Sequence, residues 1–151
     1  MGVLNLTPDS FSDGGNVFSK AQVDPNKVLA TVSNMIGDGA DIIDLGGEST
    51  RPGAAPVSVQ EELDRVIPVL NRLTANFDSI FSIDSSTPEV MKEAADAGAH
   101  IINDVRALQR PRALQTAANL GLPVCLMHMQ NQPKTMQDNP TYDNVVLDVY
   151  D

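Results

Sequence analysis

Residues 80–104 decide the fold class of this sequence, and they read IFSIDSSTPEVMKEAADAGAHIIND. Two short apolar runs, Ile80–Ile83 and Ile101–Asn103, flank a segment with helical spacing that starts at Thr87–Glu89 and is followed by Gly98. Threonine before proline is typical of a helix N-terminus, and glycine is typical of a helix C-terminus. Short and almost wholly apolar strands on either side of a helix predict two parallel strands that are covered on both faces.

The same unit recurs along the rest of the chain. Further apolar runs occur at Val3–Leu6, Ile42–Leu45 and Val124–Met127. One expected helix begins at Asp24-Pro25 and stops at Gly37 to Gly39, and a second begins at the capping box Ser58–Glu61 and is disturbed by Pro68. Another runs from about Pro111 to Leu120 and ends at Gly121. After a loop at 130–141, a last helix is expected within Tyr142–Tyr150. Strands that alternate strictly with helices imply right-handed crossovers and a parallel sheet. A (β/α)8 barrel and an open doubly wound sheet both agree with this order.

Composition limits the class of protein. The chain has 151 residues, of which 42% are apolar and 20% are charged, and its formal net charge is −10. These values predict one soluble globular domain, and they argue against nucleic-acid or anionic-membrane partners, whose charge would be repelled. The sequence shows no run of ~18 apolar residues and no signal-peptide pattern, so we expect a cytoplasmic protein. A single cysteine, Cys125, excludes a disulfide framework and a cysteine zinc site.

Polar side chains occur at or just past the end of every expected strand. They are Asn5, Asp44 with Glu48, Asp84, Asn103 with Asp104, and His128. In parallel α/β folds, the carboxyl ends of the strands feed the loops that form the functional site. Any one of these residues is explained equally well as a strand cap or the start of a turn. The repetition at five strand ends favours a site at this edge.

Two long loops follow the first and second expected strands. Thr7–Gly15 and Gly46–Gly53 are rich in Gly, Pro, Ser and Asp. Loops of ~2 to 6 residues are sufficient in such folds, so these two favour a substrate lid over an ordinary polar turn. The sequence contains no dinucleotide fingerprint, phosphate loop or nucleophile elbow. His100 and His128 are too few and too far apart for a histidine metal site.

Five blocks of the sequence together resemble the bacterial dihydropteroate synthases: residues 2–15, 44–53, 82–84, 101–104 and 126–129. A looser resemblance is to the pterin-binding domain of corrinoid-dependent methyltransferases, which is not expected to carry the two long loops. The closer resemblance implies a (β/α)8 barrel transferase of folate biosynthesis. Such an enzyme joins 6-hydroxymethyl-7,8-dihydropterin diphosphate to para-aminobenzoate, releases diphosphate, and is inhibited by sulfonamides.

The resemblance also implies a role for individual residues, with Asn5, Arg51 and Asp84 as catalytic residues. Asn5 matches the residue that helps to hold Mg2+, the expected cofactor, on the diphosphate, while Asp84 and Asn103 match the pterin-binding pair. The remaining matches are Met127 in the pterin pocket, Thr50 as a substrate contact, Phe11, Ser49 and Pro52 in the wall of the aminobenzoate pocket, and Arg51 in the second mobile loop.

The chemistry of a pterin ring agrees with these roles, because its aminopyrimidine edge offers N–H groups that the Asp84 carboxylate can accept and Asn103 can both donate and accept. Closure of the two loops would exclude water, and the weakly basic aniline would attack without a dedicated base. Asp44 is expected to brace the loops. His128 is expected to satisfy a backbone group after a buried strand.

The length departs from the family. At ~30 residues per βα unit, 151 residues supply about five units of a barrel, so we expect residues 1–151 to be a pterin-binding domain truncated on its C-terminal side. The family's later Asp-Pro-Gly, Lys, Arg and His segments would then be missing, and with them most of the cationic half of the site. Two hypotheses follow: a synthase represented by its N-terminal portion, which forms a homodimer when full length, or a catalytically inactive pterin-binding module.

Overall fold

The computed structural model describes residues 1–7, 18–19, 22–49, 56–131 and 135–150. The main sheet consists of β1 (Gly2–Asn5), β4 (Ile42–Gly46), β5 (Ile80–Asp84), β6 (Ile101–Asp104) and β7 (Val124–Leu126). The helices are α1 (Pro25–Gly37), α2 (Val59–Asn76), α3 (Pro88–Asp96), α4 (Ala113–Leu120) and α5 (Val145–Tyr150). A small antiparallel pair, β2 (Phe18–Ser19) and β3 (Gln22–Val23), precedes α1. None of the helices in these ranges is long and apolar enough to cross a membrane.

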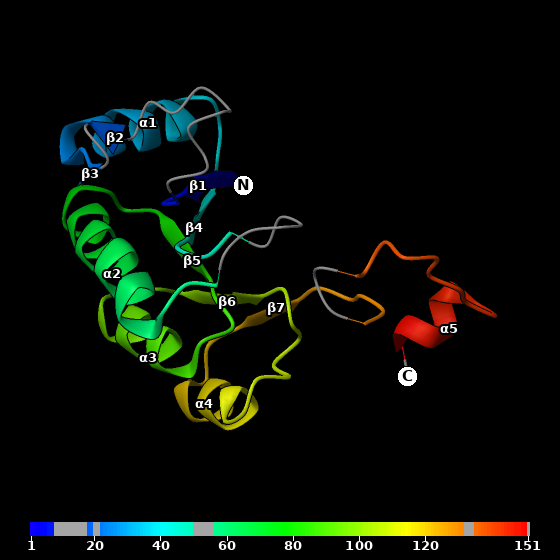
Figure 1. Cartoon of the computed structure of the whole chain (residues 1–151). Coiled ribbons are helices and arrows are strands. Elements are labelled where there is room, and N and C mark those ends of the chain that lie inside the picture. Colours follow the sequence, from blue (N-terminus) through cyan, green and yellow to red (C-terminus); the bar gives the residue numbers. More distant parts are fainter. Residues whose placement is uncertain (8–17, 20–21, 50–55, 132–134, 151) are drawn as a thin grey trace.

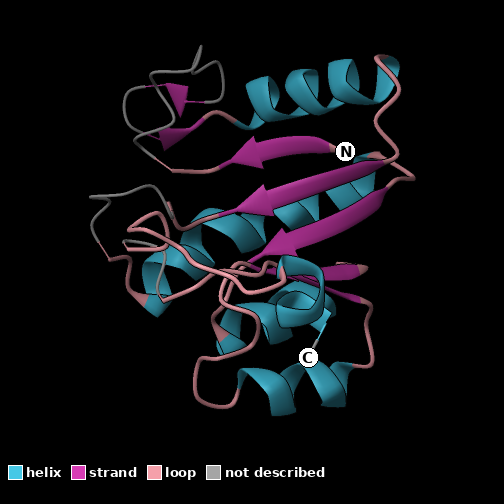
Figure 2. Ribbon diagram, turned by 90° about the vertical axis from the view of Figure 1, so that its right-hand side faces the viewer, coloured by secondary structure: helices cyan, strands magenta, loops and turns pink. Residues whose placement is uncertain are grey.

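The order of the strands distinguishes between the two predicted architectures. The sheet runs β1-β4-β5-β6-β7, so each strand pairs in parallel with its neighbour in chain order. A doubly wound sheet reverses its order at a switch point, whereas a barrel adds every strand beside the previous one. The observed order is that of a barrel. The helices α1 to α4 lie together on one side of the strands, as the two views in Figures 1 and 2 show.

The face of the sheet beneath these helices forms the hydrophobic core. Its side chains come from alternate strand positions and are at most 2% exposed: Leu4, Ile43, Leu45, Phe81, Ile83 and Ile102. Helix α2 contributes Val66, Leu70 and Leu73, and α3 contributes Val90 and Met91. The opposite face carries polar side chains at the strand ends. Because successive side chains of a strand point to opposite faces of the sheet, the core and the candidate site lie on different faces.

The expectation that every strand is buried on both faces is wrong for β7. Val124 and Leu126 are 45% and 48% exposed, and Cys125 is exposed too. A run of three or four apolar residues has too little periodicity to distinguish a central strand from an edge strand. The strand β7 is one of the two edge strands of the sheet in the described part of the chain, and that position follows from pairing and not from composition.

The helix ends mostly agree with their sequence signals. The Asp24 carboxylate accepts hydrogen bonds from the N–H groups of Asn26 and Lys27 at the start of α1. The Ser58 hydroxyl accepts from the Glu61 N–H at the start of α2, while the Glu61 carboxylate pairs with Arg65. Helix α2 continues through Pro68.

Thr87 is a correction to the expected caps. It stands at the N-cap position of α3, but its side chain makes no capping hydrogen bond. Its hydroxyl donates instead to Glu62 of α2, at 2.7 Å, and the Ser85 hydroxyl accepts from the Thr87 N–H at 3.1 Å. A threonine in this position therefore links two helices, because a buried carboxylate competes successfully for its hydroxyl.

Candidate functional site

Three of the predicted site residues lie in one row at the carboxyl edge of the sheet. Asn5, Gly46, Asp84 and Asn103 are aligned in register across β1, β4, β5 and β6. Aligned residues of parallel strands project from the same face, so their side chains gather on the face opposite the core. A Cβ atom at Gly46 would lie 3.4 Å from Asp84 Oδ2 and 3.6 Å from Asn5 Oδ1. The absence of a side chain at Gly46 therefore leaves space between Asn5 and Asp84.

Asp44 lies two residues before this row and on the same face. Asn103 Nδ2 donates a hydrogen bond to Asp44 Oδ2 at 3.1 Å. The Asp44 side chain is buried, with 4% of the residue exposed, and its Oδ1 has no hydrogen-bond partner in the described structure. The buried Ser82 hydroxyl, in register with Asp44 on β5, is also without a partner there. The expectation that Asp44 braces the two long loops concerns segments that lie largely outside the described residues, and the contact of Asp44 seen here is with Asn103.

Burial and like charges act together on Asp84. Burial raises the pKa of its carboxyl from 3.8 to about 7, and the negative charge of Asp44 adds to the shift. Asp104, Glu62 and Glu48 raise this pKa further. Near neutral pH, Asp84 therefore exists in both the protonated and the ionised form. Perturbed carboxyls of this kind are typical of functional sites.

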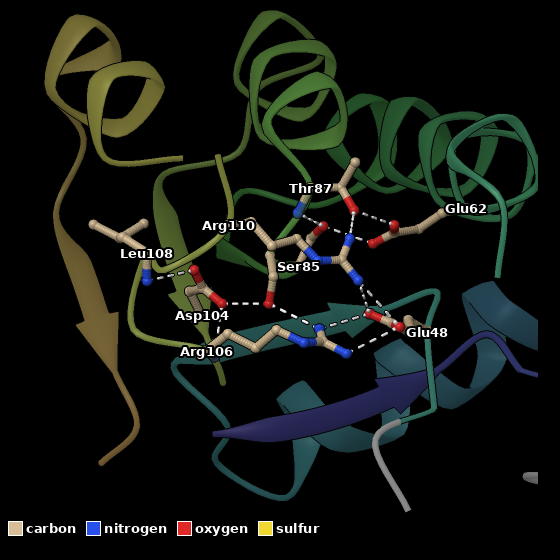
Figure 3. A network of polar contacts seen from close by, with 9 residues as sticks. Glu48, Glu62, Ser85, Thr87, Asp104, Arg106, Leu108 and Arg110 are labelled. Carbon is tan, nitrogen blue, oxygen red and sulfur yellow. Dashed lines mark hydrogen bonds and ion pairs between the residues drawn. The ribbon is translucent and has the colours of Figure 1, made fainter. Parts of the chain in front are cut away.

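A network of polar contacts lies beside the row and joins three successive strand-to-helix loops (Figure 3). Arg106 donates from Nη1 and Nη2 to the two carboxylate oxygens of Glu48, at 2.8 and 3.1 Å. Arg110 Nη2 lies 3.3 Å from Glu48 Oε2, and Arg110 Nη1 donates to the Thr87 hydroxyl at 2.6 Å. The loops after β4, β5 and β6 are thereby held together.

Two buried carboxylates anchor this network. Glu62 of α2 accepts hydrogen bonds from the hydroxyls of Ser85 and Thr87, at 2.6 and 2.7 Å. Asp104 accepts from the Ser86 hydroxyl and from the N–H groups of Arg106 and Leu108. Each carboxylate is 2% exposed or less, so its hydrogen bonds replace the lost water. The segment directly after Asp84 is therefore fixed from both sides.

Sequence reasoning did not single out Arg106 and Arg110. We expected most of the cations of the site to come from the family segments that would follow residue 151. These two arginines nevertheless lie at the same edge of the sheet, where both form ion pairs with Glu48. The available signal was their position directly after the strand-end Asp104, in the loop before α4. Their partner is remote in sequence, so the pairing depends on the fold.

The remaining predicted residues are placed less closely. Met127 follows β7, is half-buried, and donates its N–H to the Asp104 carbonyl at 3.2 Å. Ser49 is half-buried after the Glu48 contact. His128 is exposed, and its Nε2 lies 3.1 Å from the Tyr142 hydroxyl, so the expected backbone partner is wrong. The residues outside the described ranges are Phe11, Thr50, Arg51 and Pro52.

The donors at the row fit one kind of magnesium site. Within the described residues, no three His, Cys, Asp or Glu side chains gather in a way that could hold a metal ion. Mg2+ usually keeps several waters and takes one or two protein ligands besides substrate phosphates. The Asn5 side-chain oxygen, which lies beside the space left by Gly46, could supply one such ligand. This arrangement suits an ion that arrives on a diphosphate and does not suit an ion caged by the protein.

The fold and the candidate site together define a class of protein: a barrel-type parallel α/β protein whose carboxyl edge carries acidic and amide side chains. The family model described as pterin binding enzyme matches residues 1–151, and the chain belongs to this family.

Relatives and solved structures give the same result. A dihydropteroate synthase of Haemophilus influenzae is 58% identical over 149 residues, which cover 99% of this chain and 52% of that protein. The crystal structure of the Yersinia pestis dihydropteroate synthase with a sulfonamide drug has a TM-score of 0.90 at 55% identity, covering 99% of this chain and 53% of that one. The Yersinia pestis enzyme with a pterin-sulfa conjugate has a TM-score of 0.80 at 46% identity, with coverage of 99% and 49%. The chain thus spans about half the length of the relatives it matches.

Proposed function

We propose that the row Asn5, Gly46, Asp84 and Asn103 binds the pterin substrate of dihydropteroate synthesis. In that reaction, 6-hydroxymethyl-7,8-dihydropterin diphosphate is joined to para-aminobenzoate and diphosphate is released. The observation that carries the proposal is the alignment of Asp84 and Asn103 on neighbouring strands. A carboxylate accepts two N–H bonds from an aminopyrimidine edge, and an amide beside it adds a further donor or acceptor. A site with such buried groups rejects ligands that leave them unpaired.

Asn5 is the proposed protein ligand of Mg2+. When bound, Mg2+ would neutralise the charge that develops on the departing diphosphate. The residues of the chain have a different task, which is to hold the pterin beside that ion. The placement of Asn5 and Asp84 on either side of Gly46 supports this division, because it puts the pterin residue next to the proposed metal ligand.

The aminobenzoate side of the reaction is assigned to the two long loops. Phe11, Ser49 and Pro52 would form the wall of its pocket, Thr50 would contact substrate, and Arg51 would supply a cation. Met127 would line the pterin pocket. A sulfonamide is bound in the Yersinia pestis relative, and this supports sulfonamides as inhibitors at the same site.

We also assign the reaction to the cytoplasm and a homodimer to the full-length protein. Cys125 is a free thiol, which suits a reducing compartment. The homodimer is supported by the family resemblance.

A catalytically inactive pterin-binding module is the second candidate, because the chain spans only 52% of the Haemophilus influenzae relative. The 151-residue chain is assayed for dihydropteroate with the pterin diphosphate, Mg2+ and para-aminobenzoate, and pterin binding is measured by calorimetry. Dihydropteroate formation supports the synthase. Binding without turnover supports the module. A chain that neither binds nor turns over contradicts both candidates.

The exchange of Asp84 for asparagine tests the site itself. At pH 8.5, where Asp84 is ionised, Asp84→Asn is expected to weaken pterin binding tenfold or more, since a charge-assisted hydrogen-bonded pair is worth about 1.5 to 3 kcal/mol. Binding to the unaltered chain should fall as the pH drops below about 7, while the variant should show no such dependence. The exposed Asp78→Asn is the matched control. Unchanged affinity in Asp84→Asn rejects the pterin assignment.

A further inference from the structure

We propose that Asp44 is a positioning residue for pterin recognition, because its carboxylate fixes the orientation of the Asn103 side-chain amide. The proposal rests on the proposed function and adds a residue that lies behind the pterin-binding pair. It concerns the orientation of the Asn103 side chain, beside Asp84, before a ligand binds.

An asparagine amide has two orientations that exchange its oxygen and its nitrogen. In this structure, Asn103 Nδ2 faces Asp44 Oδ2 at 3.1 Å and donates to it. The reversed orientation would bring Asn103 Oδ1 against the same carboxylate, and two acceptors would then face each other. A carboxylate at position 44 therefore permits one orientation of Asn103 and opposes the other.

The position of Asp44 makes it an effective support. It lies on β4, which pairs with β1 on one side and with β5 on the other. It is 4% exposed, and the bond from Asn103 satisfies only one of its two oxygens, since Oδ1 has no partner in the described structure. The Asn103 amide thus supplies the hydrogen bond that offsets part of the cost of burying this carboxylate.

The register shows where the amide oxygen goes. Asp44 aligns with Ser82, two residues before Asp84, whereas Asn103 aligns with Asp84 itself. The nitrogen of the Asn103 amide is consequently turned back along the sheet, and the oxygen is turned toward the carboxyl edge. Beside Asp84, the site then presents a second acceptor, which selects a ligand edge rich in N–H donors.

A double-mutant cycle on pterin affinity tests the proposal, with Asp44→Asn, Asn103→Ala and the double variant measured at pH 8.5. Asparagine at position 44 can donate as well as accept, so it allows both orientations of Asn103. We expect Asp44→Asn to weaken pterin binding threefold or more when Asn103 is present, and less than twofold in the Asn103→Ala background. Asp44→Ser is the second variant, with the same expected coupling. The exposed Asp41→Asn, which removes a charge just before β4, is expected to change neither value.

The side-chain amide resonances of Asn103 supply a signature that does not depend on ligand binding. They are expected to move in Asp44→Asn and to stay in place in Asp41→Asn, with thermal unfolding as the check on folding. Equal losses of affinity with and without Asn103 overturn the proposal, as do unmoved resonances. A chain that binds no pterin contradicts the proposed function, and the resonances then still decide whether Asp44 orients Asn103.

Discussion

Asp84 combines a proposed recognition role with a cost in stability. Its carboxyl is buried among other acids, and its pKa is raised from 3.8 to about 7. In the unfolded chain, the same group would titrate near its ordinary value. Between these two pH values, the folded state binds more protons than the unfolded state. The folded state therefore gains stability from Asp84 as the pH falls from 7 toward 4, and loses that contribution as the pH rises through 7.

Asp84→Asn should remove this dependence. Above pH 7 the buried charge is gone in the variant, so its free energy of unfolding should exceed that of the unaltered chain by about 4 kcal/mol, since one pKa unit corresponds to about 1.4 kcal/mol. Near pH 4 the two proteins should differ little. Urea denaturation at pH 4, 6 and 8 measures the effect. An equal gain at all three values would contradict the raised pKa.

The residues of the site were predicted unequally by the sequence. Polar residues after apolar runs correctly predicted that Asn5, Asp84 and Asn103 lie at one edge of the sheet, because parallel strands bring their carboxyl ends together. The contact of Asp44 and the pairing of Arg106 with Glu48 were not predicted. Both depend on side chains 58 or 59 residues apart, for which local spacing carries no signal.

At the scale of elements, the approach of α2 to the end of β4 depends on Gly47. A Cβ atom there would lie 2.7 Å from Val66 Cγ2 and 3.1 Å from Glu62 Cγ, both on α2. These distances are shorter than carbon atoms tolerate, so a larger residue would push the helix away from the sheet.

We expect Gly47→Ala to lower the free energy of unfolding by about 1 to 3 kcal/mol, as overpacking usually does. Gly37→Ala is the control: nothing lies within 4 Å of its added Cβ, and alanine in a helix is favoured over glycine by about 0.5 to 1 kcal/mol. Chemical denaturation should therefore show a lower free energy of unfolding for Gly47→Ala and a higher one for Gly37→Ala. A neutral Gly47→Ala would show that α2 is not packed as described.

The loops after β4 and β6 depend on Arg106. Its two bonds to Glu48 require a planar fork, which lysine lacks. Arg106→Lys should lower the free energy of unfolding by about 1 to 2 kcal/mol, since hydrogen bonds to charged groups are worth about 1.5 to 3 kcal/mol. Arg112→Lys alters an exposed pair with Glu89 and should change it by about 0.5 kcal/mol or less. Equal effects in the two variants would mean that the Glu48 pair contributes no more than a surface contact.

At the scale of the whole molecule, the sheet of the described residues has β1 and β7 as its edges. In a closed barrel the two end strands are paired, whereas Val124 and Leu126 of β7 are about half exposed here. Helix α5 also exposes Val146 and Leu147. An apolar edge strand of this kind favours association between chains.

The 151-residue chain should therefore self-associate, and Leu126→Lys should reduce that association, because a charge on an edge strand opposes pairing. Leu114→Lys is the control, since Leu114 is 67% exposed but lies on helix α4 and not on an edge strand. Sedimentation velocity over a range of concentrations measures the association. A monomer at all concentrations, or equal effects of the two substitutions, would contradict the role of β7.

The sequence by itself determined the alternation of strands and helices, most of the helix ends and the strand-end residues of the proposed pterin site. Those features depend on local periodicity and on short-range hydrogen bonds, as at Asp24 and Ser58. The tertiary structure decided the rest: the barrel order of the strands, the exposure of β7, the diversion of Thr87 to Glu62 and the bond from Asn103 to Asp44. Each of these depends on which distant segments become neighbours, and burial then determines which polar groups must pair.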